Sequence, residues 1–169
     1  MKRIRIAWIG ASVALLLATA VYAQGQKATS TFGDWSAYAH DDTKSKICFV
    51  VSQPKSQEPK NANRNPAYFY VSAWPRESVK NEVSVKIGYP FKKGTEATVT
   101  VGTASFKLFT QNERAFLGDL TQELKLIDAM RKGSSLQVQG TSERGTNTTD
   151  TYSLAGFGQA LQALAGLCQ

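Results

Sequence analysis

The chain has 169 residues, and its 20 Lys and Arg against 13 Asp and Glu give a net charge of +7 at pH 7. This length is sufficient for one domain with a hydrophobic core but short for two. Because 42% of the residues are hydrophobic, the composition excludes an intrinsically disordered protein. The basic residues are dispersed along the chain, so we predict a solvated cationic surface and no nucleic-acid partner.

Residues 1–23 have the features of a secretory signal peptide. Three basic side chains precede an uncharged apolar run over residues 6–20, and Val21 and Ala23 place small or modest side chains where a signal peptidase requires them. We therefore expect cleavage after Ala23, which leaves 17 basic against 13 acidic residues and a net charge of +4. The alternative is a retained membrane anchor, although an apolar run of about 15 residues is shorter than the roughly 20 needed to span a bilayer.

The rest of the chain divides into a flexible polar lead at residues 24–30 and one domain at residues 31–169. No later apolar stretch is long enough to cross a membrane, so no transmembrane segment is expected after cleavage. The only cysteines, Cys48 and Cys168, would reach an oxidising compartment, where two thiols in one chain pair. We predict that they form a disulfide that closes a long loop.

Most of the predicted domain consists of short strands in which apolar and polar side chains alternate. Antiparallel strands with one buried face have this period of two, and turn residues separate the segments here. The strands are expected at 35–38, 47–51, 68–74, 83–87, 99–101, 106–108, 136–141 and 148–154. The fold class is therefore mainly β, an antiparallel β-sandwich-like domain with two short helices.

Residues 53–66 interrupt this pattern with three prolines among polar side chains. Proline lacks the N–H that a ladder needs, so we expect a long exposed loop.

The first helix is expected to begin after Asp119, which can cap it, and to end at Gly133. Four apolar residues at spacings of 4, 3 and 3 predict its buried face: Leu120, Leu124, Ile127 and Met130. The second helix lies at the C-terminus and carries an apolar stripe made of Phe157, Ala160, Leu161, Leu164 and Leu167. Cys168 falls on the same side, so this helix should dock on the sheet.

Catalytic, metal and cofactor sites are not predicted. His40 is the only histidine; a proton relay or metal ligand is the functional alternative, but we interpret it as an exposed turn residue. Gly156-Phe157-Gly158 begins like a dinucleotide fingerprint without its final glycine, and we interpret it as a helix start.

Aromatic side chains concentrate in the segment 68–74. Tyr68, Tyr70 and Trp74, together with Arg76, form a candidate binding surface, because rings beside a guanidinium suit sugars or nucleic acid. The alternative is that the rings divide between core and surface along one strand.

Several short segments together carry a family resemblance. They are Phe32-Gly33-Asp34-Trp35, Ile47-Cys48-Phe49, Pro66-Ala67-Tyr68, Asn81-Glu82-Val83-Ser84 with Gly88-Tyr89, Ala129-Met130-Arg131-Lys132-Gly133, and Asp150-Thr151-Tyr152-Ser153-Leu154-Ala155-Gly156-Phe157 leading to Cys168. In their order and spacing the chain resembles the invasion-associated locus B family of proteobacterial exported proteins over roughly residues 31–168.

The resemblance implies a β-rich periplasmic, envelope-associated or secreted protein in a family named for host-cell invasion. Some relatives carry a further cysteine soon after the opening tryptophan, whereas this chain has Ser36, Ala37 and Tyr38 there, so no second disulfide is expected. The expected function is non-enzymatic binding to a protein, envelope or host-surface partner. The alternatives are a periplasmic small-ligand or glycan binder, a weak hydrolase, or a structural or stress-linked envelope component.

Overall fold

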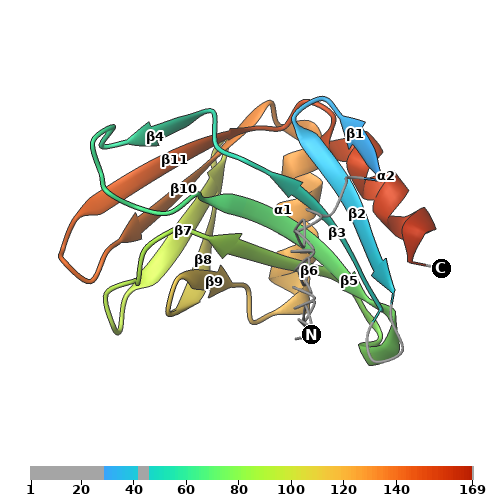
Figure 1. Ribbon diagram of the computed structural model, residues 1–169, viewed down its shortest axis with the longest axis horizontal. Coiled ribbons are helices and arrows are strands. Elements are labelled where there is room, and N and C mark those ends of the chain that lie inside the picture. Colours follow the sequence, from blue (N-terminus) through green and yellow to red (C-terminus); the bar gives the residue numbers. More distant parts are fainter. Residues whose placement is uncertain (1–28, 42–45, 169) are drawn as a thin grey trace, which may run out of the picture.

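The computed structural model describes residues 29–41 and 46–168, so the expected signal peptide and its cleavage site lie outside the described residues. Strands dominate the chain order (Figure 1). The elements are β1 (Ser30–Phe32), β2 (Trp35–Asp41), β3 (Lys46–Ser52), β4 (Ser56–Glu58), β5 (Tyr68–Trp74), the 3-10 helix η1 (Pro75–Glu77), β6 (Val79–Lys86), β7 (Glu96–Val101), β8 (Ala104–Gln111), β9 (Arg114–Phe116), α1 (Leu120–Lys132), β10 (Ser135–Thr141), β11 (Asn147–Ser153) and α2 (Phe157–Leu167).

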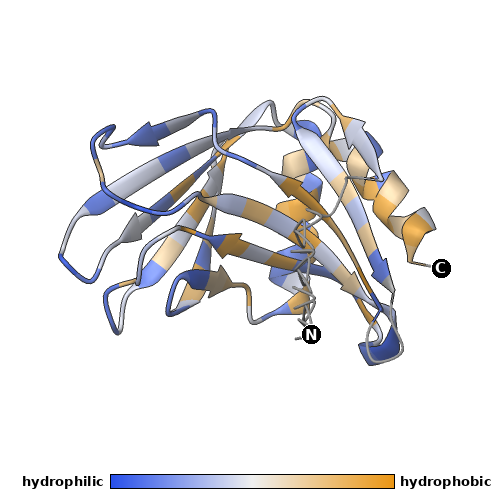
Figure 2. Ribbon diagram, in the orientation of Figure 1, coloured by the Kyte–Doolittle hydropathy of each residue, from blue (hydrophilic) through white to orange (hydrophobic). Residues whose placement is uncertain are grey.

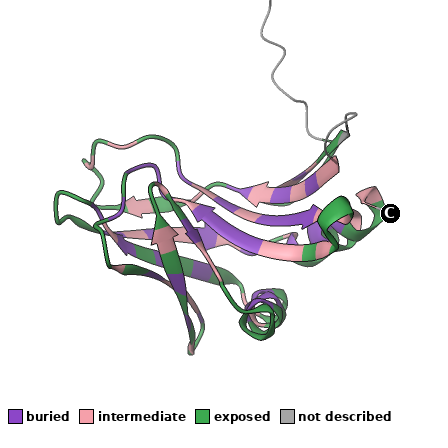
Figure 3. Ribbon diagram, turned by 90° about the horizontal axis from the view of Figure 1, so that it is seen from below, coloured by how far each residue is buried: buried purple, intermediate pink, exposed green. Residues whose placement is uncertain are grey.

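All the strands join one sheet in the order β1-β2-β3-β5-β6-β9-β8-β7-β10-β11-β4, and each pairing is antiparallel. Twist accumulates over this many strands, so the sheet curls until its two halves face each other (Figures 1 and 3). We call these halves the limbs: one contains β1, β2, β3, β5 and β6, and the other contains β8, β7, β10, β11 and β4. The predicted mainly β, sandwich-like fold with two helices is confirmed; the two layers are limbs of one curled sheet.

Both helices pack on the concave side of the curled sheet. Helix α2 contacts β1, β2, β3 and β5, while α1 contacts β6, β7 and β8. Apolar and polar residues alternate along much of the sheet (Figure 2), and the buried apolar side chains of the strands face the helices and the opposite limb. The core therefore lies between the limbs and beneath the helices.

A chain of touching aromatic rings crosses this core. Phe157 at the start of α2 lies 4.8 Å from Trp35 on β2, Trp35 lies 6.1 Å from Phe69 on β5, and Phe69 lies 5.8 Å from Tyr152 on β11, measured between ring centroids. The indole Nε1 of Trp35 also donates to the carbonyl oxygen of Ser153 at 3.0 Å. These contacts join the two limbs and the C-terminal helix.

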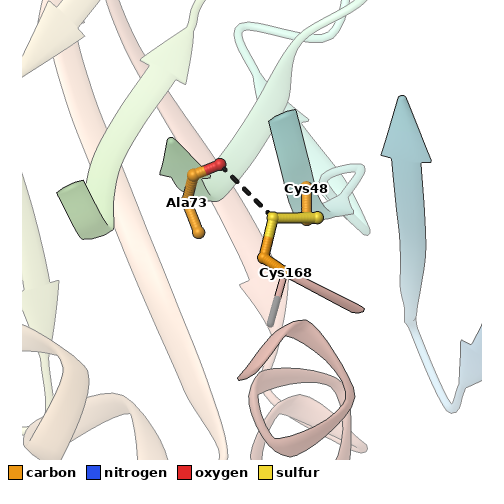
Figure 4. Close-up of a disulfide and its surroundings, with 3 residues drawn as sticks. All are labelled: Cys48, Ala73 and Cys168. Carbon is orange, nitrogen blue, oxygen red and sulfur yellow. Dashed lines mark hydrogen bonds between the residues drawn. A yellow bond between two sulfur atoms is a disulfide. The ribbon is translucent and has the colours of Figure 1, made fainter. Parts of the chain in front are cut away.

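The predicted disulfide between Cys48 and Cys168 is confirmed (Figure 4). Cys48 lies fully buried on the inner face of β3, and Cys168 follows the last residue of α2. The bond joins residues 120 positions apart with a Cα–Cα distance of 5.8 Å. The Cys168 Sγ also lies 3.8 Å from the carbonyl oxygen of Ala73 on β5, a packing contact because a disulfide sulfur carries no hydrogen.

Two glycine turns meet backbone to backbone beside this core. Gly156 adopts a φ of 87°, and a Cβ added there would lie 2.0 Å from the carbonyl oxygen of Phe32. Gly33 adopts a φ of 55°, and the neighbouring Asp34 N–H donates to the Ala155 carbonyl oxygen at 3.0 Å. The Phe32–Trp35 and Leu154–Phe157 motifs are therefore two sides of one close backbone contact.

The buried face of α1 differs from the prediction. Asp119 caps the helix as expected, since its Oδ1 accepts from the Gln122 backbone N–H at 2.8 Å. Leu120 and Leu124, however, are 66% and 51% exposed. The buried side chains of the helix are Glu123, Leu126, Ile127 and Met130.

The reason lies at β6, where the pairing with β9 begins only at Ser84. The Val83 backbone N–H needs another acceptor, and the Oε1 of Glu123 accepts from it at 3.0 Å. Turning Glu123 toward the sheet rotates Leu120 and Leu124 toward solvent.

The expected loop at residues 53–66 is also more ordered than predicted. Within it β4 pairs with β11, Gln57 lying opposite Asp150. Such a three-residue edge strand depends on its partner, so its own sequence carries no strand signal.

Candidate binding surface

The aromatic strand β5 divides its side chains between two faces. Phe69 and Val71 are fully buried in the core, whereas Tyr68 and Tyr70 are partly exposed on the opposite, outer face of the sheet. This division follows from the period of two along a strand. The outer face of β5 therefore presents two of the four residues of the candidate surface side by side.

Tyr68 and Tyr70 belong to a longer row of touching rings. The Tyr38 ring stacks on Phe49 with centroids 5.0 Å apart and planes 10° apart. The Phe49 ring meets Tyr70 edge-on at 5.9 Å, and Tyr70 lies 5.9 Å from Tyr68 at a tilt of 37°. We call these four residues the outer aromatic row. Such offset and edge-on arrangements are the favourable geometries for aromatic pairs.

The sheet register builds the row. Tyr38 on β2 lies directly opposite Phe49 on β3. On the other side of β3, Val51 lies opposite Tyr70 on β5, so Phe49 is the diagonal neighbour of that ring. Residues far apart in sequence thus share one face because three neighbouring strands pair in this register.

Basic side chains border the row at the β5 end. The Arg114 guanidinium on β9 lies over the Tyr70 ring, 5.8 Å from its centroid. Lys86 lies opposite both Tyr68 and Arg114 in the register. Burial raises the pKa of Tyr70 above its usual range, an effect that the Arg114 charge partly offsets. The Tyr70 hydroxyl therefore stays protonated and able to donate.

One hollow of about 380 Å³ opens beside Tyr38 and Tyr68. Lys55 Nζ and Asp34 Oδ1 form an ion pair of 2.5 Å at its edge, and the hydrogen bond from Lys55 lowers the pKa of Asp34. Ser36 and Gln53 contribute a hydroxyl and an amide to the lining. We call this the Lys55 hollow.

A second hollow of about 340 Å³ lies at the β9 end of the same face. Its polar lining includes Lys86, Arg114, Glu113 and the amides of Gln111 and Asn112. We call this the Arg114 hollow. The outer aromatic row therefore has polar side chains on two sides, with the Lys55 hollow beside Tyr38 and Tyr68 and the Arg114 hollow beside Tyr70.

The remaining residues of the sequence-based candidate set are Trp74 and Arg76. Trp74 is partly exposed at the end of β5, and Arg76 is exposed on η1. Among the described ring pairs the contacts end at Tyr68 and do not reach Trp74. His40 is exposed as expected, but it lies on β2 and not in a turn, because β2 continues its pairing with β3 to Asp41. The described part of the chain groups no three His, Cys, Asp or Glu side chains to hold a metal ion.

A larger hollow of about 480 Å³ lies by the β10–β11 turn, but its main polar groups are already paired. The Arg64 guanidinium forms a buried ion pair with Asp150 and lies 5.8 Å from the centroid of the Tyr89 ring. The Tyr89 and Thr148 hydroxyls hydrogen-bond at 2.6 Å. These residues hold the limbs together, so we assign the outer face, not this hollow, as the candidate surface.

Tyr38, Phe49 and Arg114 are the members of the surface that sequence reasoning missed. Tyr38 alternates with the buried Ala37, and Phe49 lies between the buried Cys48 and Val50, so each falls on an outer face by the same rule that places Tyr70. The strand pairing that brings these faces together was not visible in the sequence.

The comparisons with known proteins agree with this fold. The sequence profile of the family described as "Invasion associated locus B (IalB) protein" matches residues 35–165. Among solved structures, invasion associated protein b from Bartonella henselae is similar, with a TM-score of 0.59 and 19% identity over 82% of this chain and 95% of that one. At this identity the structural likeness establishes the fold alone.

No curated protein sequence matches the chain. The helices among residues 29–41 and 46–168 include none with the length and apolar character of a membrane span. The family profile spans most of the chain, from the Trp35 that anchors the core to the helix that precedes Cys168. The chain therefore belongs to the invasion-associated locus B family.

Proposed function

We propose that the protein is exported and acts without catalysis, by binding a partner in the bacterial envelope or on a host surface through the outer aromatic row. The observation that carries this proposal is the set of touching rings on the outer face, Tyr38, Phe49, Tyr68 and Tyr70. Aromatic side chains that remain in contact with water lose part of the stabilisation that burial would supply. Such patches on a surface commonly mark a binding site.

Export is supported by the features of residues 1–23 and by the Cys48–Cys168 disulfide, which forms and persists in oxidising compartments. The name of the similar solved protein associates that protein with invasion. This association supports a partner that is reached outside the cytoplasm.

The test combines fractionation with site-specific crosslinking in intact cells. An epitope-tagged full-length chain should be recovered in the periplasmic or extracellular fraction at the mass expected after cleavage at Ala23. A photo-crosslinking amino acid at position 70 should then yield a discrete adduct. The matched control is the same amino acid at position 137, where the exposed Gln137 lies on the other limb.

Two results would overturn the proposal. One is recovery of uncleaved protein in the cytoplasm. The other is a set of adducts at position 70 that does not differ from that at position 137.

A further inference from the structure

We infer that the outer aromatic row binds an acidic oligosaccharide that lies across the sheet from the Lys55 hollow to the Arg114 hollow. This inference rests on the proposed function and names the chemistry of the partner. It is carried by the order of groups across the face: the Lys55 hollow, the Tyr68 and Tyr70 rings on β5, and the Arg114 hollow with its basic side chains.

The rings provide stacking platforms for sugar units. The apolar face of a pyranose presents C–H groups with a partial positive charge, and the face of an aromatic ring is negative. Tyr68 and Tyr70 lie on β5 between the two hollows, are partly exposed and are tilted by 37° to each other. Tyr38 and Phe49 stack on each other, so Tyr68 and Tyr70 are the rings that we expect the sugar units to contact.

The Lys55 hollow supplies hydrogen-bonding groups for sugar hydroxyls. A sugar hydroxyl both donates and accepts, so it is satisfied by side chains of mixed character. Ser36 offers a hydroxyl, Gln53 an amide, and the Lys55–Asp34 pair offers a donor beside an acceptor. A protein partner that contacted the row through aliphatic side chains would offer no hydrogen-bonding group to the Gln53 amide, at a cost.

The Arg114 hollow accounts for the acidic character of the ligand. Lys86 and Arg114 bring two positive charges to it, whereas Glu113 brings one negative charge. Neither basic side chain forms an ion pair with another residue in the described part of the chain. The planar guanidinium can bind a carboxylate through two parallel hydrogen bonds, which favours a uronic-acid unit at this end.

The experiment measures saccharide binding to the oxidised protein, purified after export, by isothermal titration calorimetry. The probes are hyaluronan hexasaccharide and hexagalacturonate as acidic chains, chitohexaose as a neutral chain of equal length, and glucuronic acid as a single unit. An acidic hexasaccharide should bind about tenfold more tightly than chitohexaose. It should also bind more tightly than glucuronic acid, which cannot reach both hollows.

Variants locate the binding. Tyr70→Ser should weaken acidic hexasaccharide binding about 5- to 10-fold through the lost stacking, while Tyr70→Phe keeps the ring and should restore most of it. Arg114→Gln should remove the preference for the acidic chain. The matched controls are Leu124→Ser and Arg131→Gln, which change an exposed apolar and an exposed basic side chain on α1 and should leave binding unchanged.

The outcomes separate the two proposals. The inference is overturned if neither acidic chain binds, if chitohexaose binds equally well, or if Tyr70→Ser and Arg114→Gln bind like the controls. An adduct with a protein at position 70, together with no saccharide binding, would overturn the glycan inference and leave the proposed function standing. Circular dichroism and urea unfolding of each variant show that a loss of binding is not a loss of fold.

Discussion

Arg64, in the segment before β5, and Asp150 on β11 form an ion pair with only 4% and 0% of their side chains exposed. Arg64 Nη1 also lies 3.4 Å from the Ile87 carbonyl oxygen, to which it donates. Burial raises the pKa of Asp150, and the hydrogen bond and charge of Arg64 act in the opposite direction. The pair joins the segment before β5 to β11, so the position of one limb against the other depends on it.

Removing one partner of this ion pair should destabilise the protein strongly. Arg64→Met leaves the Asp150 carboxylate buried without a counter-charge, and we expect a loss of about 3–5 kcal/mol in the free energy of unfolding. Urea unfolding at neutral pH measures it. The double variant Arg64→Met with Asp150→Leu removes both charges and should be more stable than the sum of the two single changes predicts. Strict additivity of the single effects would show that the pair is not coupled.

Loss of the Cys48–Cys168 disulfide should lower stability through the unfolded state. Its closed loop of 120 positions corresponds to about 4–5 kcal/mol of chain entropy. The variant with both Cys48→Ala and Cys168→Ala should therefore unfold at a markedly lower urea concentration than the oxidised protein. Reducing agent should shift the urea midpoint of the wild type toward that of the variant and leave the midpoint of the variant unchanged. An unchanged midpoint in the double variant would contradict the prediction.

Glu123 should make stability depend on pH. Burial raises the pKa of its carboxyl group, the Val83 N–H opposes this rise, and the Glu82 and Asp119 charges add to it. The pKa of Glu123 is higher in the folded protein than in the unfolded chain. The contribution of Glu123 to the free energy of unfolding is therefore fully present below the unfolded pKa and is lost as the pH rises through the folded pKa. Glu123→Gln does not ionise, so its stability relative to wild type should increase between about pH 4 and pH 7.

Thermal unfolding at both pH values measures this difference. Asp128→Asn changes an exposed carboxylate on the same helix and serves as the matched control. Glu123→Ala removes the acceptor altogether, leaves the Val83 N–H unpaired and should cost about 1–3 kcal/mol. A gap between Glu123→Gln and wild type that stays constant or shrinks with rising pH would refute the assigned burial effect.

Replacing Gly156 by alanine should destabilise the protein, whereas replacing Gly158, two positions later, should not. Gly156→Ala places a Cβ 2.0 Å from the Phe32 carbonyl oxygen at a φ of 87°, so the backbone contact between the two turns must open. We expect a loss of more than about 1 kcal/mol. Gly158→Ala in α2 meets open space and should be neutral or stabilise by up to about 1 kcal/mol. Equal effects of the two changes in urea unfolding would rule out the close contact.

Local patterns in the sequence predicted a large part of this fold. Alternation along β3, β5 and β10 indicated strands with one buried face, and Asp119 indicated the start of α1. These features depend on interactions between residues a few positions apart, so they can be predicted from the sequence. The same alternation placed Phe69 and Tyr70 on opposite faces without showing which face was the core.

The sequence-based predictions were wrong where the position of a residue depends on a contact with a residue far away in the sequence. Leu120 and Leu124 have the spacing of a buried helix face. The Val83 N–H on β6 has no strand partner, however, and its hydrogen bond to Glu123 turns Glu123 inward and the two leucines outward. Likewise β4 forms only because β11 offers it an edge.

The amino-acid order alone was enough for the mainly β class, the pairing of Cys48 with Cys168, and the family, because composition, spacing and the count of cysteines carry them. The curl of the sheet, the Arg64–Asp150 pair and the row from Tyr38 to Tyr68 required the folded chain. Each depends on the register between strands far apart in sequence, and that register is set by how the whole core packs, which no short segment encodes.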